Sequence, residues 1–235
     1  MKAIRHIVLL LVIVQTVLTS CSHEYSITGN VSHDVARGQM LYLSVNHDMQ
    51  TRSHIDSCQI VHGRFNMIGE ADTIVMARLY VDREMVMPLV IESGEMDVKI
   101  DYYTKSVKGG TLNVLLNKYL LEMAKLQSEW EELYERRIRL YMSGNLKPHI
   151  HDELDAQEQD IRNRMEMTET KFICENYTNA LGPGMFLLLT ERLPLPLITP
   201  QIEEILDNAP KEFLNTPIVM TFMKMANYKV GIQKK

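Results

Sequence analysis

Cysteine is scarce in this 235-residue chain, which holds three, and no two of them form a C-x-x-C pair. A self-contained thiol–disulfide oxidoreductase normally carries that motif, so the sequence argues against this class. Cys21 has a separate role described below, which leaves Cys58 and Cys174. Geometry decides whether two cysteines can pair, and free cysteine is among the most buried residue types. We expect two separately buried, unpaired thiols, with a disulfide between them as the alternative.

Catalytic signatures are also missing. The chain has no H-E-x-x-H, no G-x-S-x-G, no P-loop and no dinucleotide fingerprint. We therefore expect a protein that is not an enzyme and that holds no cofactor or metal. The formal net charge is −5, whereas nucleic-acid binders usually carry a basic surface, so no nucleic-acid partner is expected. A content of 46% hydrophobic and 23% charged residues is typical of globular chains and excludes a disordered or fibrous protein.

The one long apolar run lies in the first twenty residues. Lys2 and Arg5 precede the apolar stretch 7–14, which is shorter than the roughly 20 residues that a membrane-spanning helix needs. This layout is typical of a secretory signal peptide over residues 1–20. The next residues, Leu-Thr-Ser-Cys ending at Cys21, resemble the lipobox of bacterial lipoproteins, in which the cysteine carries the lipid. The alternative is a plain signal peptide with an incidental cysteine.

Lipid attachment at Cys21 decides the expected location. Removal of residues 1–20 takes away Lys2 and Arg5 and leaves a net charge of −7. Several acyl chains anchor a protein far more firmly than one. We therefore expect a soluble body tethered to a membrane of the cell envelope. The outer membrane is favoured, with the body facing the periplasm or the cell surface.

Residues 21–110 are predicted to form a β domain. Short apolar runs, such as Tyr25–Val31 and the one that begins at Met40, are separated by turn residues. His62-Gly63 lies between two such runs and predicts a hairpin. Asp56-Ser57 is interpreted as a turn at a strand start, where the side chains bond their own backbone. This many short strands predict an antiparallel β-sandwich or open barrel.

Residues 111–235 are predicted to form a helical domain, so the overall class is α+β. Apolar residues recur at spacings of three and four from Asn113 to Tyr141, which predicts one long helix that ends at Gly144-Asn145. Asn113 is a candidate helix cap. A second helix, poorer in apolar residues, is predicted from Asp152 to about Asn176.

The remaining helices are shorter. Gly182-Pro183-Gly184 is predicted to break the chain before a helix over residues 185–193. Thr199-Pro200 and Thr216-Pro217 each predict a helix start, with the threonine as cap and the proline at the first helical position.

Several short motifs recur in an order that matches a known family. They are Tyr25–Gly29, Asp56-Ser57, Gly63–Phe65 with Gly69, Glu92–Gly94 and Gly110–Asn113, followed by Phe172-Ile173, Asn176 and Gly182. With these residues the chain resembles a domain-of-unknown-function family of Bacteroides-type lipoproteins. The resemblance implies a domain that usually precedes a thioredoxin-like or peroxiredoxin-like domain. In that architecture the thioredoxin-like domain would begin near Val230-Gly231. Because the sequence stops at Lys235, the redox site of the longer relatives is not expected in it.

Candidate metal ligands each have a structural alternative. His149 and His151 would share one face of a strand, but the segment opens a polar helix, and a convincing site needs three or four converging ligands. Met85 and Met87 could present two thioethers to Cu(I) from one strand face, although methionine usually fills gaps in a core. A buried polar site built from Asp56 and Glu92 is conceivable, but turn roles are favoured.

The long helix carries two further candidates. Arg136, Arg137 and Arg139 follow a run of glutamates, and Glu132–Arg136 and Glu135–Arg139 are spaced to form ion pairs along a solvated face. A separate anion site is the alternative.

Aromatic residues follow one stripe of the same helix. Tyr119, Trp130, Tyr134 and Tyr141 favour helix packing over a carbohydrate platform, but any exposed part of the stripe would indicate a binding surface.

The leading hypothesis is a lipid-anchored cell-envelope protein that acts as a non-enzymatic binding or interaction module with an envelope protein partner. The alternative is an accessory factor that works in trans with a thioredoxin-like oxidoreductase. A third hypothesis is a cryptic enzyme or metal protein that uses His149, His151 or Cys58.

Overall fold

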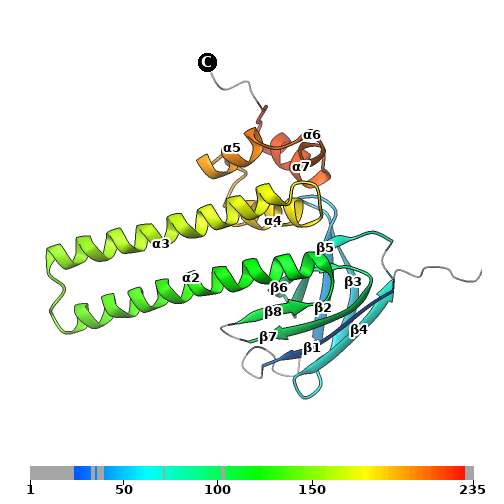
Figure 1. The fold of residues 1–235 in the computed structure, drawn as a ribbon, viewed down its shortest axis with the longest axis horizontal. Coiled ribbons are helices and arrows are strands. Elements are labelled where there is room, and N and C mark those ends of the chain that lie inside the picture. The colour runs from blue at the N-terminus through cyan, green and yellow to red at the C-terminus, as the bar shows by residue number, and fades with distance from the viewer. Residues whose placement is uncertain (1–23, 33–34, 36–39, 71, 102–103, 231–235) are drawn as a thin grey trace, which may run out of the picture.

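The computed structural model describes residues 24–32, 35, 40–70, 72–101 and 104–230, so the predicted signal peptide and Cys21 lie outside the described residues. Strands occupy the first part of the chain and helices the second (Figure 1). The strands are β1 Glu24–Val31, β2 Met40–Asn46, β3 Arg52–Gln59, β4 Arg64–Glu70, β5 Val75–Val81, β6 Glu84–Ile91, β7 Gly94–Ile100 and β8 Lys105–Lys108. The helices are α2 Thr111–Met142, α3 Pro148–Glu175, α4 Leu181–Glu191, α5 Pro200–Asp207, α6 Lys211–Leu214 and α7 Pro217–Met225.

The strands form two sheets that face each other. Sheet A has the order β4-β1-β7-β8, and sheet B has the order β3-β2-β5-β6. Residues that alternate along each strand fill the space between the sheets, among them Ile27, Leu43, Leu79 and Val98. This confirms the predicted α+β class with an open β-sandwich. The sheets are antiparallel except for the pair β1–β7, which is parallel.

The predicted turn at His62-Gly63 is confirmed. Both residues have positive φ, 51° and 74°, as a two-residue hairpin turn of type I′ requires. Val61 and Arg64 on either side exchange both backbone hydrogen bonds at 2.9 Å. The turn carries the chain from β3 at the edge of sheet B to β4 at the edge of sheet A.

The predicted turn at Asp56-Ser57 is wrong as a strand start, because β3 begins four residues earlier at Arg52. The Asp56 carboxylate does accept a hydrogen bond from the Ser57 N–H at 2.7 Å. It does so beside a β-bulge, where Leu43 pairs with Asp56 and the next residue pairs with His54. β3 is an exposed edge strand with many polar residues, so its sequence lacks the alternation of apolar and polar residues by which a strand is recognised.

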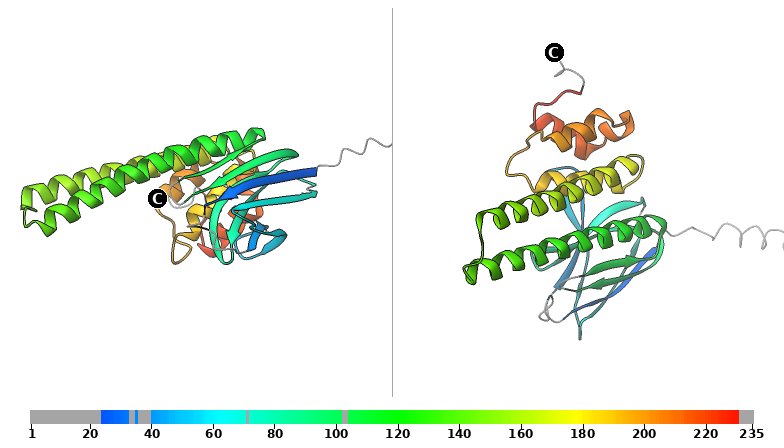
Figure 2. Two further views of the ribbon diagram at one scale, coloured as in Figure 1. Left: turned by 90° about the horizontal axis from the view of Figure 1, so that it is seen from below. Right: turned by 60° about the vertical axis from the view of Figure 1, so that its left-hand side comes forward.

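The two long helices form an antiparallel hairpin. α2 confirms the predicted long helix and turns through Gly144, whose φ is +67°. α3 begins at Pro148, four residues before the predicted start, because proline is well suited to the first helical position. Figures 1 and 2 show that the hairpin projects from the body of the molecule.

The predicted break at Gly182-Pro183-Gly184 is wrong, because these residues form the first turn of α4. A helix needs no N–H from Pro183 in its first turn. Gly184 is required by packing, since a Cβ there would collide with the Met76 side chain on β5. The predicted starts at Pro200 and Pro217 are confirmed.

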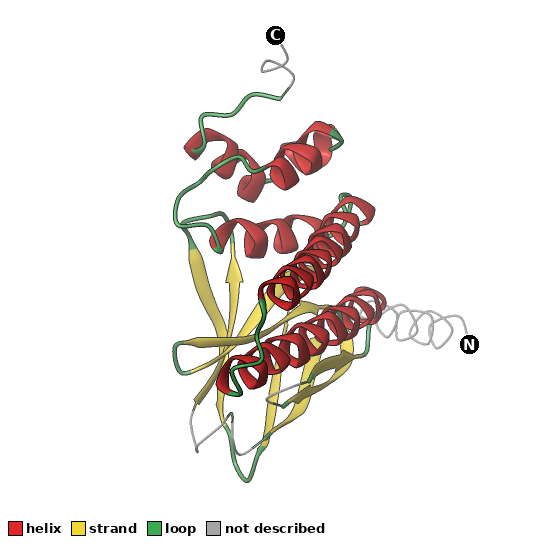
Figure 3. Ribbon diagram, turned by 90° about the vertical axis from the view of Figure 1, so that its left-hand side faces the viewer, coloured by secondary structure: helices red, strands yellow, loops and turns green. Residues whose placement is uncertain are grey.

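The helices lie on one side of the strands, with α2 against the sheets and α5–α7 farther away (Figure 3). α4 packs on β5, and α5 to α7 close over α3 and α4. Within the described residues, no helix combines the length and apolar character needed to cross a bilayer.

Candidate functional site

The start of α2 is fixed by a group of side chains that we name the α2 clasp: Glu92, Gly110, Asn113 and Asn117. Asn113 is fully buried and donates to the Val90 carbonyl at 2.7 Å, while its own carbonyl accepts from the Val90 N–H at 2.8 Å. β6 is an edge strand of sheet B, so Asn113 satisfies backbone groups that no neighbouring strand pairs. The predicted role of Asn113 as helix cap is therefore wrong.

Glu92 performs the capping. Its carboxylate accepts from the backbone N–H groups of Leu112 and Asn113 at 3.0–3.2 Å, where the helix dipole favours negative charge. Gly110 is the N-cap, with φ +80°, and a Cβ there would collide with the Glu92 carboxylate. Glu92 and Asp56 do not form one site, because they lie at the two opposite edges of sheet B.

Asn117 completes the clasp on the other sheet. Its carbonyl oxygen accepts from the Val107 N–H of β8 at 3.1 Å. β8 is an edge strand of sheet A and β6 an edge strand of sheet B. The first turns of α2 therefore bridge the two sheets along one open side of the sandwich.

The clasp also sets the direction of the hairpin. The first residues of β1 and β7 lie side by side, with Tyr25 paired to Gly94, and Gly109 packs on the Glu95 backbone just before α2 begins. α2 thus starts at the end of the sandwich where β1 starts. With a rise of 1.5 Å per residue, its 32 residues carry the hairpin tip about 48 Å away. Figure 2 shows the tip and the start of β1 at opposite ends of the molecule.

The distal half of the hairpin has its own small core. Leu133, Leu154 and Ile161 are buried there, apart from the main core of the molecule. Arg137 of α2 ties the helices together through Asp155 at 2.8 Å and Glu158 at 3.0 Å. Hydrogen bonding from Arg137 holds the pKa of Asp155 below its usual value.

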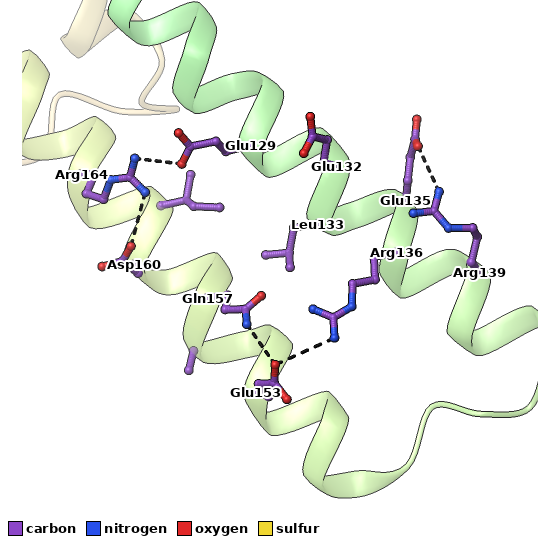
Figure 4. A pocket seen from close by; sticks show the side chains of 12 residues that line it. Glu129, Glu132, Leu133, Glu135, Arg136, Arg139, Glu153, Gln157, Asp160 and Arg164 are labelled. Carbon is purple, nitrogen blue, oxygen red and sulfur yellow. Dashed lines mark hydrogen bonds and ion pairs between the residues drawn. The ribbon is translucent and has the colours of Figure 1, made fainter.

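One side of the hairpin is a charged groove of about 880 Å³, in which Leu133 lies between the two helices (Figure 4). The buried Ile161 also lines the groove. Its charged residues are largely paired with one another. The ion pairs are Arg164–Glu129 at 2.8 Å, Arg164–Asp160 at 3.5 Å, Arg136–Glu153 at 3.9 Å and Arg139–Glu135 at 3.2 Å. The predicted Glu135–Arg139 pair is confirmed. The predicted Glu132–Arg136 pair is wrong, because Arg136 reaches across to Glu153 of α3.

The other side of the hairpin carries exposed apolar residues. We name Tyr134, Ile138, Tyr141 and Met142, together with the partly buried Trp130 beside them, the aromatic flank. Tyr134 is 51% exposed, Ile138 43%, Tyr141 70% and Met142 78%, and Trp130 stacks on Tyr134 with ring centres 5.5 Å apart.

The groove and the aromatic flank lie on opposite sides of the hairpin. Successive helical residues are 100° apart, so Glu132 in the groove and Tyr134 in the flank stand on either side of the buried Leu133.

Tyr119 does not belong to the flank, although the sequence places it on the same stripe. It is buried at the base of the hairpin, where it stacks on Phe172 at 4.5 Å and donates to the Glu169 carboxylate at 3.4 Å. Burial and the Glu169 charge raise the pKa of the Tyr119 hydroxyl. Glu169 is itself buried and ion-paired with Arg192. This network joins α2, α3 and the end of α4, and no sequence signal identified it, because Glu169 lies within an ordinary polar helix.

Neither of the two candidate pairs of metal ligands, His149 with His151 and Met85 with Met87, forms a metal site. His149 and His151 lie in the exposed first turn of α3, and His151 contacts Asp155 at 3.0 Å. Met87 is in the main core, and a bulge separates its pairing on β5 from that of Met85. Within the described ranges, no group of three or more histidine, cysteine or acidic residues is placed to hold a metal ion.

The cysteines also remain apart. Cys58 lies on β3 and Cys174 near the end of α3, and both are unpaired, as predicted. The predicted full burial of the thiols is wrong, because both residues are only partly buried. Burial raises the pKa of both thiols, so neither is activated as a nucleophile.

Residues 25–116 match the family described as "Domain of unknown function (DUF4369)". This supports the predicted resemblance to a domain-of-unknown-function family for that part of the chain. No curated protein and no solved structure matches the chain. The match includes the sandwich and the α2 clasp up to Asn113, and it stops before the aromatic flank.

The family motifs therefore coincide with structural contacts. Gly69 lies against the Tyr25 ring, and Gly29 lies against the Phe65 ring, so each glycine of the β1–β4 pair accommodates an aromatic side chain of the other strand.

Proposed function

We propose that the protein is a lipid-anchored cell-envelope binding module that contacts an envelope protein partner through the aromatic flank. The observation that carries the proposal is the exposure of four large apolar side chains, Tyr134, Ile138, Tyr141 and Met142, on one side of a projecting helix. Aromatic residues and methionine are enriched where proteins meet. The sequence favours helix packing for the aromatic stripe, but Tyr134 and Tyr141 of that stripe are exposed, and an exposed part supports a binding surface.

The direction of the hairpin supports the same proposal. The proposed lipid site, Cys21, precedes β1 by three residues, and α2 starts at the same end of the sandwich as β1. A body anchored there would present the aromatic flank on the side away from the membrane, where a partner has access to it.

A non-enzymatic role agrees with the chemistry of the described residues. The charged groove has its arginines engaged in ion pairs, and the buried Glu169 is held by Arg192 and Tyr119. These groups stabilise the hairpin and its base, and none of them is arranged around a nucleophile.

Site-specific photocrosslinking in cells tests the proposal. A benzophenone amino acid replaces Tyr141 in the full-length protein, and the same amino acid replaces Lys171, an exposed residue near the base of α3, as the matched control. We expect a crosslinked envelope protein when the benzophenone amino acid stands at position 141 and none when it stands at position 171. Adding Tyr134→Ser to the protein that carries the crosslinker at position 141 should lower the yield of the crosslink. The same adducts from both positions, or none from Tyr141, would contradict the proposal.

The identity of the captured protein separates the two roles. A thioredoxin-fold protein would favour the accessory role in trans, whereas an envelope transport or assembly protein would favour a general binding module. Anchoring is tested separately by Cys21→Ser, which should release the protein from the membrane fraction.

A further inference from the structure

A second feature, independent of the hairpin, lies where sheet B meets the C-terminal helices. A cavity of about 320 Å³ opens between the ends of β2 and β5 and the first turns of α4 and α7. Its volume is at the lower end of the range for small-molecule sites. Its lining is Asn46, His47, Ile74, Val75, Met76, Arg78, Ala180, Pro183, Gly184, Leu187, Thr216, Pro217 and Ile218.

Two polar groups of this lining lack a partner. The Arg78 side chain is only 6% exposed, and its Nη2 makes no hydrogen bond, while the Asn46 carboxamide oxygen is likewise buried without a partner. Arg78 pairs with Ser44, two residues before Asn46 on β2, so both side chains project from the same face of sheet B. Buried polar groups in folded proteins are nearly always hydrogen-bonded, and an exception calls for a missing partner. Arg78 Nη2 needs an acceptor, whereas the Asn46 oxygen needs a donor, so an anion would satisfy Arg78 alone.

The other end of the guanidinium is already engaged. Arg78 Nη1 donates to the Glu191 carboxylate at 2.6 Å, which holds the side chain in place and leaves Nη2 available. Glu191 does not line the cavity. The ionisable residues that line it, His47 and Arg78, are both basic.

The start of α7 also lies at this cavity, which Ile218 lines from the first turn of that helix. α4 begins here too, but its Leu181 N–H already donates to the Asn179 carboxamide oxygen at 2.9 Å and Pro183 has no N–H, so α4 offers little to an anion. The Thr216 hydroxyl, which could cap α7, instead donates to the Phe213 carbonyl at 2.8 Å. The start of α7 therefore has no side-chain cap, and helix starts favour an anion because their N–H groups and dipole point toward it.

The rest of the lining is apolar. Ile74, Met76, Leu187 and Ile218 surround the polar end, so an inorganic ion would leave most of the cavity unfilled. We propose that this cavity binds a small organic carboxylate with a compact apolar body. The carboxylate would meet Arg78 Nη2 and the start of α7, and the body would contact the apolar side chains.

Fluorine NMR on the full-length protein, purified in detergent, tests this proposal with 4-fluorobenzoate. The neutral analogue 4-fluorobenzyl alcohol has the same ring and no carboxylate. We expect line broadening and a chemical-shift change for the benzoate, with at least tenfold weaker binding of the alcohol. Excess inorganic phosphate should not displace the benzoate, because it cannot fill the apolar part.

Variants locate the site. Arg78→Met should weaken benzoate binding at least tenfold, whereas Arg83→Met, in the exposed turn after the same strand, should leave it unchanged. Arg78→Met also removes the Glu191 ion pair, so a second variant, Ala180→Phe, narrows the cavity and leaves that pair intact. It should abolish binding. Equal binding of benzoate and alcohol, no binding of either, or full binding by both cavity variants would overturn the proposal.

Discussion

The Asn113 side chain pairs with the backbone of Val90 as a neighbouring strand would, donating to the carbonyl at 2.7 Å and accepting from the N–H at 2.8 Å. The helix that leads to the projecting hairpin is thereby joined to an edge of the sandwich. A glutamate at the end of the same strand caps the helix. The position and angle of the hairpin therefore depend on a few side chains at its start.

Asn113→Ala should lower the free energy of unfolding by about 3 kcal/mol, because it leaves the buried N–H and carbonyl of Val90 unpaired, at about 1–3 kcal/mol for each unsatisfied group. Asn117→Ala removes a single bond to Val107 and should cost about 1 kcal/mol. Urea unfolding measures both. Equal losses for the two variants would show that Asn113 does not serve as a strand substitute.

Gly29→Ala should destabilise the sandwich more than Gly69→Ala. A Cβ at Gly29 would collide with the Val98 carbonyl as well as the Phe65 ring, whereas a Cβ at Gly69 meets the Tyr25 side chain alone. A side chain can move aside more easily than the backbone of a paired strand. We expect about 3 kcal/mol for Gly29→Ala and less than about 2 kcal/mol for Gly69→Ala, within the usual range for overpacking. Thermal unfolding of the two variants gives the order, and the reverse order would contradict this account.

The hairpin tip should loosen in acid. The pKa of Asp155 is held down in the folded chain by Arg137, so its ion pair stabilises the tip above the ordinary carboxyl pKa of about 3.9. That contribution is lost as pH falls through the lowered pKa. Trp130 is the sole tryptophan and packs against the hairpin core, so its fluorescence reports this change.

Fluorescence should therefore be constant from pH 7 to about pH 5 and should change below about pH 4. Asp155→Asn should already show a loosened tip at pH 7 and a smaller change in acid. Asp152→Asn serves as the control, because Asp152 is exposed and lies three residues before Asp155, about one helical turn away. An acid transition of the same size in all three proteins would assign it to other groups.

Substitutions of exposed hairpin residues should leave the stability of the fold nearly unchanged, whereas substitutions of buried hairpin residues should lower it. Tyr141→Ser should change the free energy of unfolding by less than about 0.5 kcal/mol, because the side chain is largely solvent-exposed. Leu133→Ala removes one of three residues that form the distal core and should cost about 2–4 kcal/mol. Circular dichroism melts compare the two. A strong loss of stability in Tyr141→Ser would mean that the flank is structural.

The sequence predicted those features that depend on residues within a single helix or turn. Spacing alone predicted α2. The dipeptide His62-Gly63 between two apolar runs predicted a hairpin, because glycine readily adopts the positive φ that a tight hairpin turn requires. The sequence was misleading where partners lie far apart in the chain. Asn113 was placed near a helix start, yet its partner Val90 lies 23 residues earlier, and no local pattern shows this pairing.

The aromatic stripe illustrates the same limit. Spacing placed Tyr119 and Tyr134 on one side of α2, but only the structure shows that Phe172 covers the first and that the second is left exposed. The low apolar content of α3 indicated a solvated face, without showing which part of α2 it would leave uncovered. The cavity beside Arg78 joins β2, β5, α4 and α7, and no sequence window contains them together.

The parallel pairing of β1 with β7 has a kinetic consequence. Tyr25 pairs with Gly94, so most of the sandwich must be synthesised before β1 can pair with one of its two neighbours. Sheet B, built from closer pairings such as β2–β3 and β5–β6, can form earlier, because short loops close at lower entropic cost. We expect sheet B and its turns to be structured in the folding transition state, with sheet A closing last.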